Sequence, residues 1–197
     1  MFANILHLII FTFGSLLMLL VVLRFLLQLA KADFYNPISQ GVVRVTKPLL
    51  MPLRRIIPGF WGIDLASVVL MLLIQLLVIF LMGLVIGQQV LFTYPFHALA
   101  WAVLGTLTLV SNIYFWAIII NIVVSWVAPH SHHPALMLIS QLIHPLMAPV
   151  RKLLPPLGGV IDISPILVLM GLKVVDIVIY RAAEAVYLAP KMVIGIW

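Results

Sequence analysis

The amino-acid sequence predicts an all-α membrane protein with four transmembrane helices, arranged as two parallel helix–loop–helix repeats. Hydrophobic residues make up 65% of the 197-residue chain and charged residues only 8%, whereas soluble domains carry about 25% charged residues. Several apolar runs also reach the roughly 20 residues that cross a hydrocarbon core. Composition therefore excludes a typical soluble domain, and a repeated motif divides the chain into halves.

Four apolar runs are predicted as transmembrane helices, with approximate bounds 5–30, 65–86, 102–127 and 163–183. The fourth run is the most polar, because it contains Lys173 and Asp176. Between the second and third runs, residues 91–101 carry Tyr94, Phe96 and Trp101, which predict an interfacial linker because aromatic side chains favour the membrane surface. The N-terminal run lacks a basic start and a cleavage signal, so we expect it to be retained.

An internal repeat defines the predicted units, 1–90 and 102–197. A shift of 97 residues sets 47–58 on 144–155, where three prolines and an arginine coincide. One further inserted residue brings Asp64 close to Asp162, just before the second span of each unit. Each unit crosses the bilayer twice, so the two copies have the same orientation, which disfavours an inverted-repeat transporter.

The stretch between the two spans of each unit is predicted to be an amphipathic segment in the headgroup layer. Apolar residues recur there at helical spacing in two stripes: Val42, Val45, Leu49, Leu53 and Ile56; and Leu138, Leu142, Leu146, Val150 and Leu153. Because proline removes a backbone donor and clashes with the preceding turn, short helical pieces joined by kinks are expected. The predicted structural motif comprises Pro48, Pro52, Pro58, Asp64, Pro145, Pro149, Pro155 and Asp162.

Basic side chains in these two loops are the candidate binding residues, either for anionic lipid headgroups or for other membrane proteins. They are Arg44, Lys47, Arg54, Arg55, His144, Arg151 and Lys152. Short loops rich in Lys and Arg remain cytoplasmic, so both loops are expected to face the cytoplasm. The basic tail residues Arg181 and Lys191 leave the side of the C-terminus open. Direct nucleic-acid binding is not expected, and self-association is a further option.

Polar residues inside the predicted spans are costly in lipid, so each is a functional candidate. They are Arg24, Gln75, Asn121, Lys173 and Asp176. Arg24 is expected to reach the interface or to pair with Asp64, and Asn121 to bond between helices. The structural interpretation of Lys173 and Asp176 is a local ion pair, and the functional one is an ion or proton path that also uses Gln75.

Histidines between the third span and the second loop are candidates for binding a metal or haem. His130, His132 and His133 lie between two prolines, and His144 follows. No acidic residue stands nearby to orient the imidazoles, and a polar turn explains the run equally well. The chain has no cysteine and no recognisable catalytic motif. We therefore expect no enzyme activity, no metal site and no cofactor.

The duplicated span, the run from Lys47 to Pro58 and Gly62-Ile63-Asp64 before the next span resemble the YggT family of integral membrane proteins. The resemblance covers nearly the whole chain and implies a multi-pass protein of the bacterial inner membrane. It links plastid relatives to cytochrome b maturation through haem attachment, YlmG-type relatives to cell division or nucleoid distribution, and enteric members to osmotic stress. It supplies no catalytic residue.

The leading functional hypothesis is a non-enzymatic inner-membrane protein that organises or assists assembly of membrane components through its basic loops. Arg54, Arg55, Arg151 and Lys152 are the expected contact residues. One alternative is a transport or osmotic-stress component with a polar seam of Gln75, Asn121, Lys173 and Asp176. The other is a haem or cytochrome maturation factor that uses the histidines.

Overall fold

The computed structural model describes residues 2–60, 62–87, 90–128, 131, 133–153 and 162–195. These residues form helices, with one isolated β-bridge between Phe60 and Ile63. In chain order the helices are α1 (Phe2–Leu29), α2 (Pro37–Ile56), α3 (Leu65–Ile86), α4 (Val90–Thr93), α5 (Pro95–Val127), α6 (Pro134–Leu153), α7 (Ser164–Ala185) and the 3₁₀-helix η1 (Pro190–Met192). The predicted all-α class is confirmed.

Three helices of the described chain, α1, α3 and α5, are long and apolar enough to cross a membrane. They correspond to the first three predicted spans. The bounds of α3 are those predicted, 65–86, because Asp64 precedes its first turn and Gly87 ends it in the left-handed conformation (φ 77°). The predicted fourth span corresponds to α7, which is not among the three because its turns carry more charge.

The segment 91–101, predicted as an interfacial linker, is mostly helical. α4 ends at Thr93 and α5 begins at Pro95, whose fixed φ suits a first helical turn. Trp101 was expected at the membrane surface, but it is 6% exposed and donates its indole N–H to the carbonyl of Val186 (3.0 Å). A buried indole N–H needs such a partner, so Trp101 ties α5 to the end of α7.

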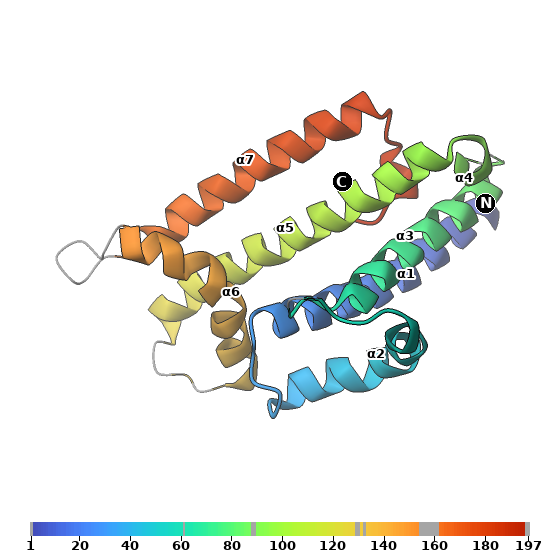
Figure 1. Ribbon diagram of the computed structural model, residues 1–197. Helices are drawn as coiled ribbons and strands as arrows, with labels where there is room; N and C mark the ends of the chain where they lie inside the picture. Colours follow the sequence, from blue (N-terminus) through green and yellow to red (C-terminus); the bar gives the residue numbers. More distant parts are fainter. Residues whose placement is uncertain are drawn as a thin grey trace.

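The long helices lie in two pairs, α1 beside α3 and α5 beside α7, and α3 also packs against α5 (Figure 1). Their shared core contains fully buried Met18, Val22, Ile79, Met82 and Ile118. α2 and α6 lie at the end of the bundle away from the N-terminus and α4 (Figure 1). The chain therefore gathers both amphipathic segments at one end.

Neither pair of helical prolines divides its helix. Pro48 and Pro52 lie inside α2, and Pro145 and Pro149 lie inside α6, so the predicted short pieces are replaced by one 20-residue helix in each case. All four prolines are exposed, and a spacing of four places each pair on one side of its helix. The carbonyl groups that lose a helical donor there can be satisfied by water or headgroups.

The face that α2 buries differs from the predicted stripe. Its buried residues are Ser39, Val42, Thr46 and Leu50, whereas Val45, Leu49 and Ile56 of the stripe are exposed. α6 similarly buries Leu138, Leu142, Ile143 and Met147 and leaves Leu153 exposed. Each helix is therefore apolar on two sides, one against the bundle and one outward, and contact of the outward stripe residues with the headgroup layer stays a prediction.

The C-terminal segment after α7 turns back into the bundle (Figure 1). Met192, Val193 and Ile194 are buried. Side chains from two helices bond to its backbone: Gln75 Nε2 donates to the carbonyl of Ile194 (2.8 Å) and Asn112 Nδ2 to that of Gly195 (3.3 Å). The tail therefore fills space between α3 and α5 and satisfies polar groups that face it.

Two glycines permit this close approach. A Cβ on Gly105 would meet Gln75, Val193 and the carbonyl oxygen of Ile194, the last at 2.8 Å. Gly195 has a φ of +96° and lies so close to α5 that a Cβ would be 2.6 Å from the carbonyl oxygen of Gly105. Because backbone cannot move aside as a side chain can, both positions require glycine.

We predict that Gly105→Ala lowers the free energy of unfolding by about 1–3 kcal/mol, the usual cost of overpacking. The matched control is Gly171→Ala in α7, where a Cβ meets no atom within 4 Å; it should leave stability unchanged or raise it by up to about 1 kcal/mol. Thermal unfolding of both variants in detergent measures the difference. Equal stability of the two variants would contradict the packing of the tail against α5.

Candidate functional site

The basic end of the molecule consists of α2, α6 and the residues that flank α2, 30–36 and 57–64. Two hydrogen bonds join its halves: Asn36 Nδ2 donates to the carbonyl of Pro134 (2.8 Å), and the Asp33 amide donates to Gln141 Oε1 (2.9 Å). Asn36 also caps α2, because its side chain accepts from the Ile38 amide. The cap of one amphipathic helix thus also holds the start of the other.

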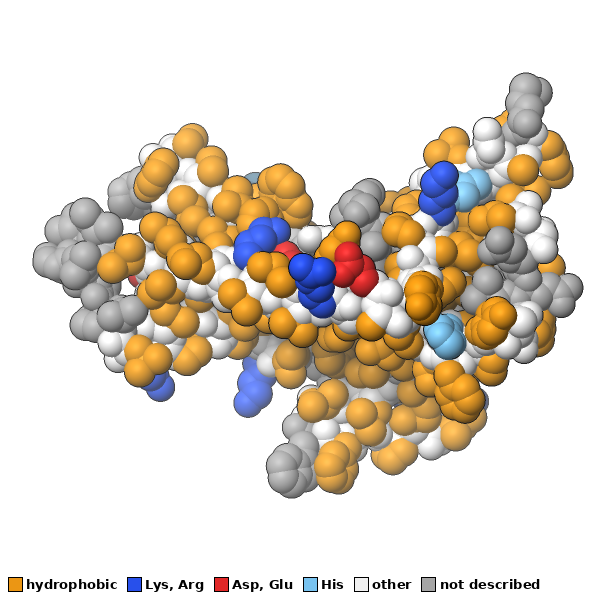
Figure 2. Space-filling view, turned by 90° about the horizontal axis from the view of Figure 1, so that it is seen from above, with side chains coloured by type: hydrophobic (Ala, Val, Ile, Leu, Met, Phe, Trp, Pro, Cys, Tyr) orange, Lys and Arg blue, Asp and Glu red, His pale blue; other side chains and the backbone are white. Residues whose placement is uncertain are grey.

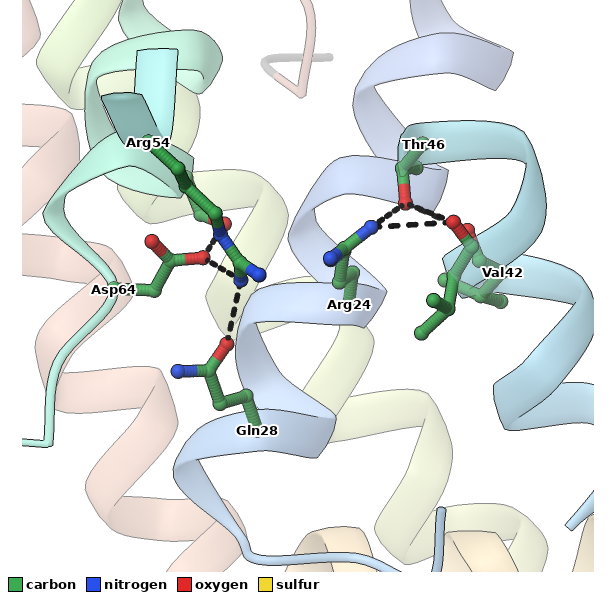
Figure 3. A network of polar contacts seen from close by, with 8 residues as sticks. Arg24, Gln28, Val42, Thr46, Arg54 and Asp64 are labelled. Atoms are coloured by element: carbon green, nitrogen blue, oxygen red, sulfur yellow. Dashed lines mark hydrogen bonds and ion pairs between the residues drawn. The ribbon is translucent and has the colours of Figure 1, made fainter. Parts of the chain in front are cut away.

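An ion pair fixes the far end of α2. Arg54 Nη2 lies 2.5 Å from Asp64 Oδ2 and also donates to Gln28 Oε1 at 3.2 Å (Figure 3). Asp64 is 6% exposed and accepts a second hydrogen bond from Ser67 Oγ (2.5 Å). Arg54, one of the predicted contact residues, therefore links α2 to both α1 and α3.

Burial alone would raise the pKa of the Asp64 carboxyl. Hydrogen bonds from Arg54 and Ser67, together with the positive charge of Arg54, outweigh burial and bring this pKa below its ordinary value. Asp64 therefore remains ionised at neutral pH and holds α2 as a charged acceptor.

A second ion pair occupies the corresponding place after α6. Arg151 Nε lies 2.8 Å from Asp162 Oδ2, and the Ser164 amide donates to Asp162 Oδ1 (2.9 Å). Partial burial raises the pKa of Asp162, but bonding to Ser164 and pairing with Arg151 bring it below its ordinary value. The coincidence of Arg54 with Arg151 in the sequence thus corresponds to two similar contacts.

Of the two alternatives expected for Arg24, the ion pair with Asp64 is not formed. It is 8% exposed, and its Nη1 donates to Thr46 Oγ1 (2.8 Å) and to the carbonyl of Val43 (3.2 Å), both on α2 (Figure 3). Asp64 instead takes its bonds from Arg54 and Ser67. The pairing was wrong because the turn before α3 places Asp64 against the end of α2.

The remaining predicted binding residues of the basic end point outward. Arg44, Lys47, Arg55, His144 and Lys152 are exposed. None of them forms an ion pair within the described residues. The basic end therefore presents cationic side chains that are available to an external partner.

The predicted polar seam does not converge on one cavity in the described part of the chain. Gln75 is buried against the tail, and Asn121 lines a recess next to α6. Lys173 Nζ contacts Asp176 Oδ2 (3.0 Å), while Ser111 donates to the other oxygen of that carboxylate (2.5 Å). Seen from the side on which α7 lies, the surface is mostly hydrophobic with charges in small groups (Figure 2). This arrangement neutralises charges locally.

The predicted histidine cluster lies partly outside the described residues, which include neither His130 nor His132; Pro155 of the proline motif is also outside them. His133 Nδ1 accepts a hydrogen bond from the Ala135 amide (3.3 Å) at the start of α6, a contact typical of a turn. Among the described residues, no group of three or more potential metal ligands lies together.

Five polar residues that contact or line the region around Arg24 and Arg54 were not identified as site residues from the sequence: Gln28, Lys31, Ser39, Thr46 and Ser67. Ser39 and Thr46 could have been found, because with Val42 they recur at spacings of three and four on the buried face of α2. Gln28 and Ser67 gave no local signal, because their contacts cross between separate helices.

Comparison with known proteins identifies the chain's relatives. The family model described as CCB3/YggT matches residues 3–85 and, separately, residues 100–183. The chain belongs to the CCB3/YggT family. The first matched stretch contains α2 and nearly all of α1 and α3; the second contains α6 and most of α5 and α7. The resemblance to YggT proteins drawn from the sequence is therefore confirmed.

Other members of the CCB3/YggT family are similar over most of their length. An uncharacterised protein of Pseudomonas aeruginosa is 48% identical over 91% of this chain and 90% of its own. The uncharacterised protein YggT of Escherichia coli K12 is 36% identical over 91% and 90%. An uncharacterised protein of Vibrio alginolyticus, encoded in the proC 3′ region, is 35% identical over 82% and 86%. No solved structure matches the chain.

At neutral pH, Asp64→Asn is expected to lower the free energy of unfolding by about 1.5–3 kcal/mol, because Arg54 and Ser67 lose a charged acceptor. The folded-state pKa of Asp64 is the lower one, so its contribution is complete above the unfolded pKa of about 3.9 and is lost as pH falls through the folded value. Thermal unfolding of wild type and variant across this range should show their stabilities converging in acid.

The control for this titration is Asp33→Asn, which alters an exposed carboxylate that accepts only from the Tyr35 amide. It should have a smaller effect at neutral pH. A stability gap between wild type and Asp64→Asn that stays constant down to about pH 2 would contradict the assignment.

Proposed function

We propose that the chain crosses the bacterial inner membrane four times, as two copies of one helix–loop–helix unit, residues 1–90 and 102–197. Helix lengths support the repeat: α2 and α6 each have 20 residues and start 97 positions apart, and α3 and α7 each have 22. The separate matches of one family model to the two halves also support it. In this scheme α1, α3, α5 and α7 are the spans.

The weakest span in composition, α7, has features that suit a bilayer. Its Lys173–Asp176 pair is supplemented by Ser111 of α5, and Lys173 Nζ lies 4.3 Å from the ring centre of Phe115. Pairing lowers the cost of placing charge in lipid. The exposed side chains of α7 are largely apolar: Ile166, Met170, Val174, Ile177 and Val178. We propose that this face contacts lipid.

The basic end is proposed to face the cytoplasm. Seven of the chain's eleven Lys and Arg residues belong to it, against two of its five carboxylates. An excess of Lys and Arg in short connections favours the cytoplasmic side. The anionic lipids of the inner leaflet then attract this end, by about 1 kcal/mol for each basic residue near the surface.

The function supported best is a non-enzymatic one, in which the basic end organises or assists assembly of membrane components. The observation that carries this proposal is the exposure of Arg44, Lys47, Arg55 and Lys152 without internal ion pairs in the described chain. Arg54 and Arg151, by contrast, are committed to Asp64 and Asp162, so we place the contact with partners on the unpaired cations.

Membrane topology is tested by single cysteines, because the natural chain has none. We predict that Lys47→Cys is labelled only from the cytoplasmic side, and Thr93→Cys only from the other side. Tyr187→Cys, at a position 85% exposed just after α7, should behave as Thr93→Cys does if α7 crosses the membrane. Labelling of spheroplasts and inverted vesicles with an impermeant thiol reagent provides the readout. Labelling of all three from one side would refute the four-span scheme.

Partner contact is tested by the double variant Arg55→Glu and Lys152→Glu. We predict that discrete products crosslinked from a photoreactive residue at position 44 fall by at least about tenfold, because reversing two surface cations removes more than the roughly 1.4 kcal/mol of attraction that corresponds to tenfold. The control is Lys191→Glu, which reverses an exposed cation of the C-terminal segment. If both variants give the same crosslinking pattern at equal amounts of inserted protein, Arg55 and Lys152 do not contact the partner.

A further inference from the structure

A cavity of about 420 Å³ lies at the basic end, between the last turns of α1 and α2. Arg24 and Gln28 line it from α1, Lys31 from the turn that follows, and Ser39 and Arg54 from the two ends of α2. No carboxylate is among its lining residues. The cavity therefore carries three basic side chains and no acidic one.

Two of these side chains are more than nine-tenths buried and have polar atoms without a partner in the described chain. Ser39 is 5% exposed, and its Oγ makes no hydrogen bond. Arg24 is 8% exposed and makes both of its hydrogen bonds through Nη1, so that Nε and Nη2 stay free. Because buried polar groups are normally bonded, the buried Ser39 Oγ indicates a missing partner, and Arg24 has guanidinium nitrogens left to donate to the same group.

Arg24 also forms no ion pair with a carboxylate of the described chain. The nearby carboxylate of Asp64 already accepts from Arg54 and Ser67 (Figure 3). A buried cation without a close anion is unfavourable, and Arg54 adds like charge to the same cavity. An anionic ligand would supply both the acceptor for Arg24 and the missing negative charge.

The second half of the chain provides an internal comparison. A cavity of about 390 Å³ lies next to α6, and a shift of 97 residues superposes its lining on that of the first. Arg24, Gln28 and Lys31 correspond to Asn121, Ser125 and Ala128. Among the described residues, which include neither His130 nor His132, no charged residue lines this second cavity. Both halves therefore have a cavity at this place, but the basic side chains line the first one. This difference indicates a ligand that binds the first half specifically.

We propose that the first cavity binds the phosphate group of an anionic phospholipid. Guanidinium groups match phosphate oxygens in geometry and charge, and Ser39 Oγ can donate to the same group. Arg24 lies five residues before the end of α1, about 8 Å inside it at the helical rise, a depth suited to a headgroup. Exposed Leu29 and Ile38 nearby offer an apolar surface to acyl chains.

This inference rests on the proposed function in one respect, because it places the basic end at the inner membrane surface. The same phosphate chemistry also occurs in soluble phosphate esters. The two sources differ in the acyl chains, so the test compares phosphatidylglycerol, phosphatidylcholine and glycerol 3-phosphate as probes.

The experiment is native mass spectrometry of the delipidated full-length protein during titration with each probe. Wild type should bind one phosphatidylglycerol in preference to phosphatidylcholine. Arg24→Gln and Lys31→Asn should each weaken this binding by about tenfold, since each removes a charge-assisted contact. Asn suits position 31, where φ is 51°, so Lys31→Asn tests the site even if Arg24→Gln fails to fold. Lys191→Gln, which changes an exposed cation of the C-terminal segment that neither lines the cavity nor belongs to the basic end, should change it less than about twofold.

The outcomes separate the possible ligands. Preferential binding of phosphatidylglycerol supports the lipid, whereas equal affinity for glycerol 3-phosphate overturns the lipid in favour of a soluble phosphate ester. Unchanged affinity in both cavity variants overturns the site altogether. That last result would leave the proposed function intact if cysteine labelling still places α2 at the cytoplasmic face, so the two failures are distinguishable.

Discussion

A charge placed against hydrocarbon needs a close partner, and this requirement governs much of the structure. Four of the chain's five carboxylates lie in ion pairs: Asp64 with Arg54, Asp162 with Arg151, Asp176 with Lys173 and Glu184 with Arg181. Two of these pairs join the last turns of α2 and α6 to an aspartate that precedes the next long helix. Because acidic residues are so few, the surplus of positive charge remains at the basic end, where it is exposed.

The interior between the helix pairs is filled by the protein's own tail. Gln75, which the sequence offered as part of a polar path, donates instead to the backbone carbonyl of Ile194, and Asn112 donates to that of Gly195. Gly105 makes room for this contact. The polar groups of the bundle therefore act as structural links among the described helices, and the chemistry available to partners lies at the basic end.

The two halves share a shape but differ in charge. Both amphipathic helices end in a basic pair, Arg54-Arg55 and Arg151-Lys152, and in both the first member contacts an aspartate. Two cavities of similar size lie beside them, and within the described chain charged side chains line the one beside Arg24 but not the other. In the proposed two-copy scheme the shared scaffold follows from duplication, and Asn121 at the position that corresponds to Arg24 explains why a phosphate ligand would select one half.

The sequence by itself determined the all-α class, the bounds of α3 and the residues of the basic end, because hydropathy and proline spacing are local properties of the chain. It also carried the family resemblance. Only the tertiary structure decided that Arg24 donates a hydrogen bond to Thr46 and that Arg54 forms the ion pair with Asp64. It also decided that the C-terminal tail packs beside Gly105. These contacts join residues from separate helices, and their partners depend on how the helices pack, which periodicity along one helix does not specify.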